Sequence, residues 1–263
     1  TPFAVISDKA NNRKYPIADY SLTPTVAIVD PALVLTVPGS VAADTGMDVL
    51  THATEAYVSQ MASDFTDGLA LQAIKLVFEN LESSVKNADF HSREKMHNAS
   101  TIAGMAFANA FLGISHSMAH KIGAQFHTIH GRTNAILLPY VIRYNGTRPS
   151  KTTTWPKYNY WKADEKFQDI AKMLGLPHST PEEAVEAYAK AVYELGVAVG
   201  IKMNFKDQGI DEKAWKDSLH EIALLAYEDQ CSPANPRLPM VADMEEIMAD
   251  AYYGYAERPG RRK

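Results

Sequence analysis

The spacing of apolar residues along the chain changes near residue 40. Before this point, the runs 3–6 and 25–29 are short and rich in apolar or β-branched residues, with a polar turn at 8–13 between them. This pattern predicts two strands of a small sheet. After Pro38-Gly39-Ser40, apolar residues recur at helical spacing. We therefore expect a short β segment over residues 1–37 and an all-helical region over residues 38–263.

Glycine, proline and polar stretches divide the helical region. The stretch 94–110 is rich in small residues, which favours a buried central helix, and 145–160 is predicted to be a long exposed loop. A hydroxyl, a proline and two acids at 179–183 indicate a helix start. We expect helices over residues 41–60, 67–86, 94–110, 115–126, 133–144, 163–174, 211–227 and 243–253, and one that begins at 179–183.

Composition excludes several classes of protein. The net charge is −5 and acids and bases are mixed along the chain, so neither nucleic acid nor an anionic membrane is expected as a partner. No apolar run approaches the roughly 20 residues that a membrane span needs. The one cysteine, Cys231, rules out an intrachain disulfide and fits a cytoplasmic location. The chain begins in a strand-like run without Met, which suggests that it starts inside a longer protein.

Candidate metal ligands form two groups in the sequence. Four of the nine histidines lie between His116 and His130, and His116 and His120 are four residues apart. Upstream, Asp48 and His52 have the same spacing, so they share one face of a largely apolar helix. Burying such groups is costly unless they are paired or bind metal. One carboxylate and several imidazoles suit a divalent first-row metal.

The spacing has simpler interpretations. A single Asp-x-x-x-His pair is usually a helix-surface ion pair, and a single buried histidine is more often a hydrogen-bonded core residue. Spacing alone does not choose between His127 and His130, or between His116 and His120. The remaining histidines lie on polar stretches and are expected to have no role in the site: His91, His97, His178 and His220.

Longer strings around these residues resemble the iron-containing alcohol dehydrogenase family. They are GMDVLTHATEAY at 46–57, GISHSMAH at 113–120 and HGRTNAILLP at 130–139. YEDQCSPANPR at 227–237 and AYYG at 251–254 are similar to the alcohol dehydrogenase half of bifunctional aldehyde–alcohol dehydrogenases, in which a CoA-dependent acetaldehyde dehydrogenase half lies upstream. The resemblance covers essentially all 263 residues.

The resemblance implies a metal site and a mainly α fold. The family's ligands fall on Asp48, His52, His116 and His130, and the implied metal is Fe²⁺, with Zn²⁺ as a possible substitute. His120 matches a catalytic-site histidine beside the metal and the nicotinamide that is not a ligand. The fold is that of the iron-dependent alcohol dehydrogenase and dehydroquinate synthase-like proteins. Residues 1–37 would be a β remnant of the nucleotide-binding domain, and residues 38–263 the helical metal-binding catalytic domain.

The implied cofactor is NAD(H), with contacts at Val5, Lys14 and Leu33. Without the resemblance, Lys14 would be interpreted as a solvated turn residue. The family's glycine-rich pyrophosphate loop does not occur in this sequence. We therefore expect the missing N-terminal segments of the same polypeptide to supply most of the NAD site, and this chain alone to be inactive.

The function that follows is the reversible, metal-dependent reduction of a short-chain aldehyde, acetaldehyde, to a primary alcohol, ethanol, with NADH. A homo-oligomer or filament is also expected. Two alternatives are a metal-dependent hydrolase or lyase without nucleotide, and a non-catalytic filament-assembly module with contacts at 145–160 and 233–239. Apolar residues near the ligands are expected either to line a substrate pocket or to pack in the core: Met47, Met105, Phe107, Phe111 and Phe126.

Overall fold

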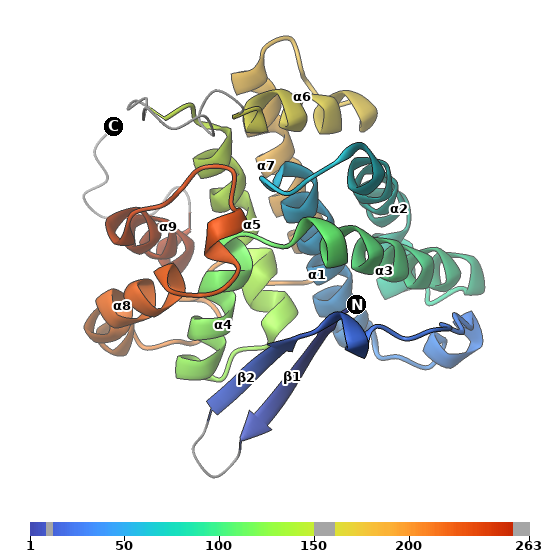
Figure 1. The fold of residues 1–263 in the computed structure, drawn as a ribbon, viewed down its shortest axis with the longest axis horizontal. Helices are drawn as coiled ribbons and strands as arrows, with labels where there is room; N and C mark the ends of the chain where they lie inside the picture. The colour runs from blue at the N-terminus through green and yellow to red at the C-terminus, as the bar shows by residue number, and fades with distance from the viewer. Residues whose placement is uncertain (9–12, 150–160, 255–263) are drawn as a thin grey trace.

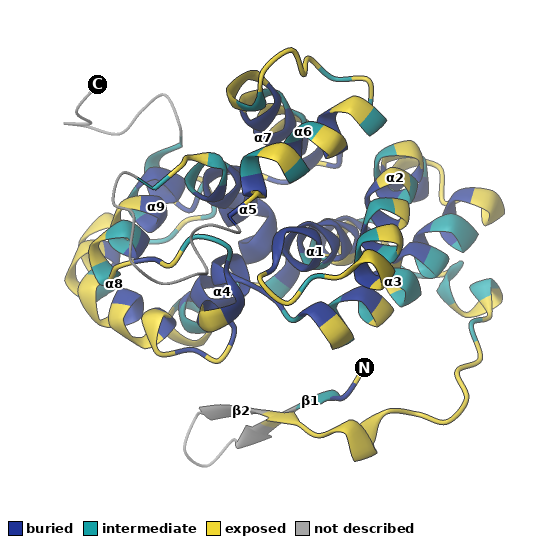
Figure 2. Ribbon diagram, turned by 45° about the horizontal axis from the view of Figure 1, so that its top comes forward, coloured by how far each residue is buried: buried dark blue, intermediate teal, exposed yellow. Residues whose placement is uncertain are grey.

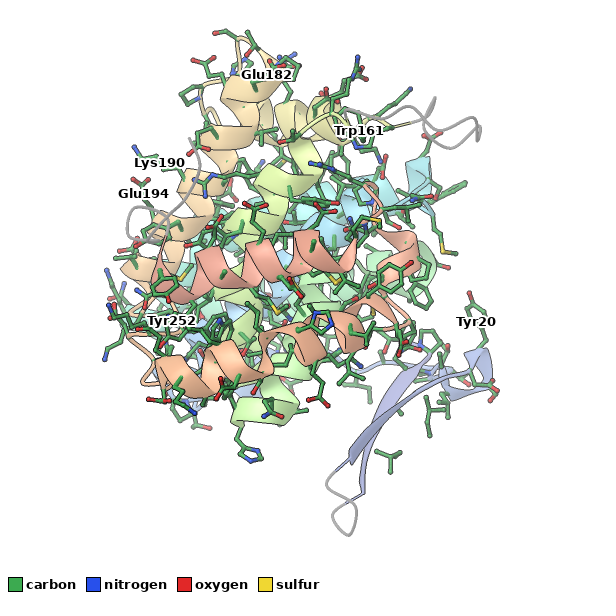
Figure 3. All side chains as sticks on the ribbon, turned by 90° about the vertical axis from the view of Figure 1, so that its left-hand side faces the viewer. Tyr20, Trp161, Glu182, Lys190, Glu194 and Tyr252 are labelled. Atoms are coloured by element: carbon green, nitrogen blue, oxygen red, sulfur yellow. The ribbon has the colours of Figure 1, made fainter. Side chains whose placement is uncertain are left out.

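An antiparallel hairpin extends from a larger helical body (Figure 1). The computed structural model describes residues 1–8, 13–149 and 161–254. Strand β1 (Phe3–Asp8) pairs with β2 (Arg13–Ala18), with Phe3 opposite Ala18 and Asp8 opposite Arg13. Two 3₁₀ turns follow, η1 (Tyr20–Leu22) and η2 (Pro31–Val34). Residues 19–28, which follow the hairpin, are exposed (Figure 2); they include Tyr20, whose side chain points away from the helical body (Figure 3).

The prediction of a strand over residues 25–29 was wrong. This run has no strand partner among the described residues, and Val26 and Ile28 are 76% and 88% exposed. β-branched residues favour a strand only where a neighbouring strand and packed side chains stabilise it. β1 instead pairs with a nearer segment that was not predicted. This segment, β2, was not predicted because its charged residues and Pro16 interrupt the pattern typical of a strand, although proline is tolerated at a sheet edge.

Nine helices make up the rest of the described chain. They are α1 (Gly39–Val58), α2 (Asp64–Lys86), α3 (Phe90–Ala110), α4 (Ile114–Phe126), α5 (His130–Gly146), α6 (Ala163–Met173), α7 (Pro181–Ala198), α8 (Glu212–Tyr227) and α9 (Val241–Tyr253), with a short 3₁₀ turn, η4 (Ser232–Ala234), before α9. Each lies on a predicted helix. Differences at the ends come from caps: Asp89 accepts from Ser92 N and starts α3 at Phe90, four residues before the predicted start.

Two details of the predicted helical region need correction. The stretch 145–160 is not wholly an exposed loop, because α5 continues to Gly146 and Asn145 is buried against Asn235. Residues 150–160 lie outside the described residues. α3 is not a central helix: its small residues bury only one face, and Met105 is 53% exposed. The central helices are α1 and α5, which are buried along most of their lengths (Figure 2).

Two hydrophobic clusters form the core, and α5 contributes to both. The first cluster joins α1, α2, α3, α6 and α7, and Ala135, Leu138 and Ile142 of α5 belong to it. The second joins α4, α8 and α9, and Ile136 and Leu137 of α5 belong to that one. Burial of large apolar side chains on both sides holds α5 between the two halves of the helical body. Its N-terminus is therefore fixed between α1 and α4.

No single helix in the described part of the chain is both long and apolar enough to cross a bilayer. The helices α3 and α4, which are bent by 106° at their junction, have the necessary length and apolarity only when they are counted together.

Candidate metal centre

Three helices bring the predicted ligands to one place. Asp48 and His52 lie one turn apart on α1, His116 lies in the first turn of α4, and His130 is the first residue of α5. One ligand atom from each of Asp48, His52 and His116 lies within 4.8 Å of the others. His116 Nε2 and His130 Nε2 are each 3.7 Å from Asp48 Oδ1. The carboxylate is thus surrounded by imidazoles from all three helices.

Hydrogen bonds occupy Nδ1 of His52 and of His116 and leave Nε2 of both rings as an acceptor. His52 Nδ1 donates to the Asp48 carbonyl at 2.7 Å, and His116 Nδ1 donates to Glu55 Oε2 at 2.6 Å. Since a neutral imidazole carries one N–H, Nε2 of both rings is unprotonated. The Asn134 amide is 3.2 Å from His130 Nε2 and 2.8 Å from Asp48 Oδ1, so it donates to acceptors on both residues.

The buried carboxylate of Glu55 fixes His116. It accepts from Gly113 N at 2.9 Å and from Ser115 N at 2.7 Å, which are backbone groups at the start of α4, in addition to His116 Nδ1. Both side chains are almost fully buried. Such an outer carboxylate sets the tautomer and the orientation of a ligating imidazole. Glu55 was not predicted as a site residue, although it lies seven residues after Asp48 on the same helix.

The electrostatics of the cluster keep the carboxylate charged and the central imidazole neutral. Burial alone would raise the pKa of Asp48, but His52, His130 and His116 together lower it. Burial and the neighbouring His52 lower the pKa of His116 well below its usual value. Burial raises the pKa of Glu55 to about 7. A charged Asp48 beside a neutral His116 is the protonation state that a divalent cation requires of these two ligands.

Close contact between α5 and α1 places His130. A Cβ atom at Gly131 would overlap the carbonyl oxygen of Asp44 and lie 3.1 Å from Asp48 Cβ, so only glycine allows this approach. Arg132 then forms a paired hydrogen bond with the Asp44 carboxylate at 2.9 and 3.0 Å. These contacts hold the first turn of α5 against the turn of α1 that precedes Asp48.

The sequence also matches known proteins. A family model described as "Fe-containing alcohol dehydrogenase family, C-terminal" matches residues 42–252. The chain belongs to this family. It is 89% identical, over all 263 residues, to an aldehyde-alcohol dehydrogenase of Streptococcus pneumoniae serotype 2, and it spans 30% of that protein's length.

Two solved structures have the same fold. A 1,3-propanediol oxidoreductase is 35% identical with a TM-score of 0.85, and the match covers 96% of this chain and 62% of that one. A sulfoacetaldehyde reductase from Bifidobacterium kashiwanohense, solved in complex with NAD⁺, is 27% identical with a TM-score of 0.80 and coverages of 95% and 60%. The mainly helical class predicted from the sequence is confirmed.

The residues present fit the metal that the family name implies. His116 Nε2 is buried and has no hydrogen-bond partner among the described residues. A buried polar atom without a partner is costly, and native proteins rarely keep one without a reason. A cation among Asp48, His52, His116 and His130 would satisfy it.

The structure separates the histidines that spacing left undecided. His130 lies beside Asp48, whereas His127 ends α4 with φ 55° and an exposed side chain. His116 is within 3.7 Å of Asp48, whereas the His120 ring stacks on His130 with centroids 5.4 Å apart and binds Asp229 through Nδ1 at 3.2 Å. The histidines assigned no role lie elsewhere; among them, His178 bonds the Leu176 carbonyl and His220 bonds Glu245.

The predicted cofactor contacts lie in the N-terminal segment. Val5 is in β1 and Lys14 in β2, but their side chains are outside the described part of the structure. Leu33 lies in η2 and is 74% exposed. The start of β1 reaches the candidate metal centre through Phe3, which stacks on Phe107 at 5.9 Å; Phe107 in turn stacks on His52 at 4.5 Å.

The apolar residues near the ligands have different environments. Met47 is fully buried in the first cluster and packs in the core. Phe126 is partly buried against the second cluster, where it stacks on Trp215, and it also lines a cavity together with His127, Ile129 and Arg132. Phe107 lies against His52, and Phe111 contacts Phe3 edge-on at 5.4 Å. Met105 is exposed. Of this group, Phe107 is the residue that stacks on a proposed ligand.

Glu55→Gln is expected to weaken metal binding by about 10–100-fold, the usual effect of changing a carboxylate behind a ligating histidine. Glutamine keeps the size of the side chain, but its amide places a donor against groups that already donate: Gly113 N, Ser115 N and His116 Nδ1. Competition with a metallochromic chelator measures the affinity. Glu186→Gln is the matched control, because Glu186 bonds Arg143 on the surface. Equal affinities in the two variants would contradict this role for Glu55.

Proposed function

We propose that Asp48, His52, His116 and His130 hold a divalent metal ion, iron in the native protein. We further propose that the chain is the metal-binding part of an enzyme that interconverts a short-chain aldehyde and its primary alcohol, acetaldehyde and ethanol, with NAD(H). The observation that carries the proposal is the unpartnered Nε2 of His116, buried 3.7 Å from the Asp48 carboxylate and surrounded by further imidazoles. Family membership supports the choice of iron and of the reaction.

A bound metal would polarise the carbonyl oxygen and stabilise the negative charge that develops on it as hydride arrives. The protein residues prepare that site. One carboxylate and three neutral imidazoles leave a divalent ion with net positive charge, while Glu55 prevents His116 from rotating. Phe107 covers one face of His52, which restricts water beside the ligands. His120 stacks on His130 and presents its ring at the margin of the cluster, where substrate and nicotinamide would meet.

We propose that residues 1–37 belong to the nucleotide-binding part of the enzyme and residues 38–263 to its metal-binding domain. Leu33 is an exposed apolar residue and can contact a cofactor, as can the backbone of the hairpin that carries Val5 and Lys14. Because the chain spans 30% of an aldehyde-alcohol dehydrogenase, we infer that other segments of a longer, bifunctional polypeptide complete the NAD site.

The decisive experiment uses the complete polypeptide that contains this chain. It is prepared metal-free and then reloaded with Fe²⁺ or Zn²⁺, and NADH oxidation with acetaldehyde is followed. We expect activity only after reloading, and higher activity with Fe²⁺ than with Zn²⁺. Activity that is independent of metal would refute the proposal. Metal-dependent hydrolysis or elimination without nucleotide would support the alternative of a hydrolase or lyase.

A role in assembly is a second candidate. Leu238 and Met240 are 47% and 69% exposed at the end of the proposed contact segment 233–239. Exposed apolar residues grouped on a surface often mark a protein interface. We propose that this segment contacts another copy in a homo-oligomer or filament. Light scattering should show concentration-dependent association that persists in His116→Ala and weakens in Leu238→Ser. If association is lost in His116→Ala and is unchanged in Leu238→Ser, this second role is contradicted.

A further inference from the structure

The loop between α8 and α9 carries a buried carboxylate that the proposed metal site does not use. Asp229 lies in the string 227–237 that resembles the family, and its side chain is 3% exposed. Its Oδ2 accepts from His120 Nδ1 at 3.2 Å and from Lys121 Nζ at 2.8 Å, and its Oδ1 accepts from Cys231 N at 3.1 Å. Each oxygen therefore has a donor, and the carboxylate is held in one orientation.

This carboxylate determines which nitrogen of His120 carries the proton. An ionised carboxylate only accepts hydrogen bonds, so Nδ1 of a neutral His120 must carry the N–H and Nε2 must be an acceptor. The ring is nearly parallel to that of His130, at 11°, and its side chain is 29% exposed. The ring is thus fixed at the edge of the ligand cluster with one accessible acceptor.

The loop is rigid enough to position a side chain. Ser232 Oγ donates to the Ala226 carbonyl at 2.7 Å and lies within hydrogen-bond distance of Ser117 Oγ of α4, at 3.0 Å. Asn235 is fully buried, and its Oδ1 accepts from Ile114 N at the start of α4. These bonds therefore fix the position of the loop against α4, the helix that carries His116 and His120. Precise sites depend on such support for their side chains.

We propose that Asp229 is the positioning residue of His120. It holds the ring beside His130 as the Nδ1–H tautomer, so that Nε2 accepts a hydrogen bond from a hydroxyl group bound at the metal site. This inference rests on the proposed alcohol dehydrogenase function. The hydroxyl belongs either to the alcohol substrate or to the ribose of the nicotinamide cofactor, since both present the same donor.

The test uses the metal-loaded complete polypeptide with Asp229→Asn, whose amide can donate to Nδ1 and favours the opposite tautomer. Bound metal should equal that of the unchanged protein, because Asp229 is not a ligand, while kcat/KM should fall about 10–100-fold. A rise confined to the KM for alcohol assigns the hydroxyl to the substrate, and a rise confined to the KM for NAD⁺ assigns it to the ribose. Asp229→Glu should recover part of the loss.

Asp243→Asn is the matched control. Asp243 accepts from Tyr144 Oη and from Met240 N, outside the cluster, and this change should leave kcat/KM within about twofold. In a His120→Gln background, Asp229→Asn should lower kcat/KM by less than a further twofold, because Asp229 acts only by positioning His120. Full additivity, or unchanged kcat/KM in Asp229→Asn alone, would overturn the proposal.

Structure determination of metal-free Asp229→Asn provides a readout that does not need activity. We expect the His120 ring to leave its 5.4 Å stack on His130, and to keep it in Asp243→Asn. An unmoved ring, with the same hydrogen-bond partners, would overturn the positioning role. If the unchanged polypeptide has no alcohol dehydrogenase activity, the proposed function fails, while the ring position still decides the role of Asp229.

Discussion

His116→Ala is expected to reduce bound metal to a small fraction of the protein and to lower alcohol dehydrogenase activity more than 100-fold. The change removes the most buried of the four proposed ligands and the group that Glu55 orients. Changing the carboxylate behind a ligating histidine typically lowers metal affinity or activity by about 10–100-fold, so the loss of the ligand itself should lower them further. It also leaves the Asp48 carboxylate with one fewer imidazole neighbour.

Elemental analysis of the purified complete polypeptide measures the metal, and NADH oxidation measures activity. His91→Ala is the control, because His91 is an exposed residue near the start of α3. It should change neither quantity. Equal metal content in the two variants would refute the assignment of His116 as a ligand, whatever their activities.

Gly131→Ala is expected to destabilise the protein by about 3 kcal/mol or more and to release the metal. Overpacking typically costs about 1–3 kcal/mol, and here the added methyl group would meet backbone atoms, which cannot rotate away. The Asp44 carbonyl carbon would be 2.8 Å from the new atom. The first turn of α5 must therefore move from α1, and His130 moves with it.

Gly68→Ala is the matched control for that change. Gly68 lies inside α2, and a Cβ atom there would have no neighbour within 4 Å. Alanine in an exposed helix interior should stabilise by about 0.5–1 kcal/mol. Chemical denaturation with and without metal measures both variants. A Gly131→Ala protein as stable as Gly68→Ala, with its metal retained, would show that α1 and α5 do not need this close contact.

Periodicity and caps predicted the helices, because each amphipathic helix carries the information for its own formation locally. The start of α7 shows this: the Thr180 hydroxyl caps Glu183 N, and Pro181 follows at the first position. The strand prediction failed for the opposite reason. Residues 25–29 have strand-forming side chains, but a strand also needs a partner, and local propensity does not specify one.

Spacing also predicted part of the candidate metal centre. The i, i+4 relation places Asp48 and His52 on one face of α1, but nothing local distinguishes His130 from His127. That choice depends on where α4 ends: His127 adopts a left-handed conformation, and the chain turns before α5 begins at His130. Glu55 and Asp229 were missed because their roles arise from contacts 61 and 109 residues away in sequence. The sequence did contain one indication of Glu55: with Asp48 and His52 it lies on the same face of an otherwise largely apolar helix.

The position of α5 has a consequence for cooperativity. Since this helix supplies side chains to both hydrophobic clusters, neither cluster can open fully while the other keeps all its partners. Amide protons of α5 should therefore exchange with solvent only in the rarest, global opening events, and the two halves should melt in one transition. Because α5 also begins at a proposed ligand, a bound ion would slow exchange on both sides of the helix and not only beside itself.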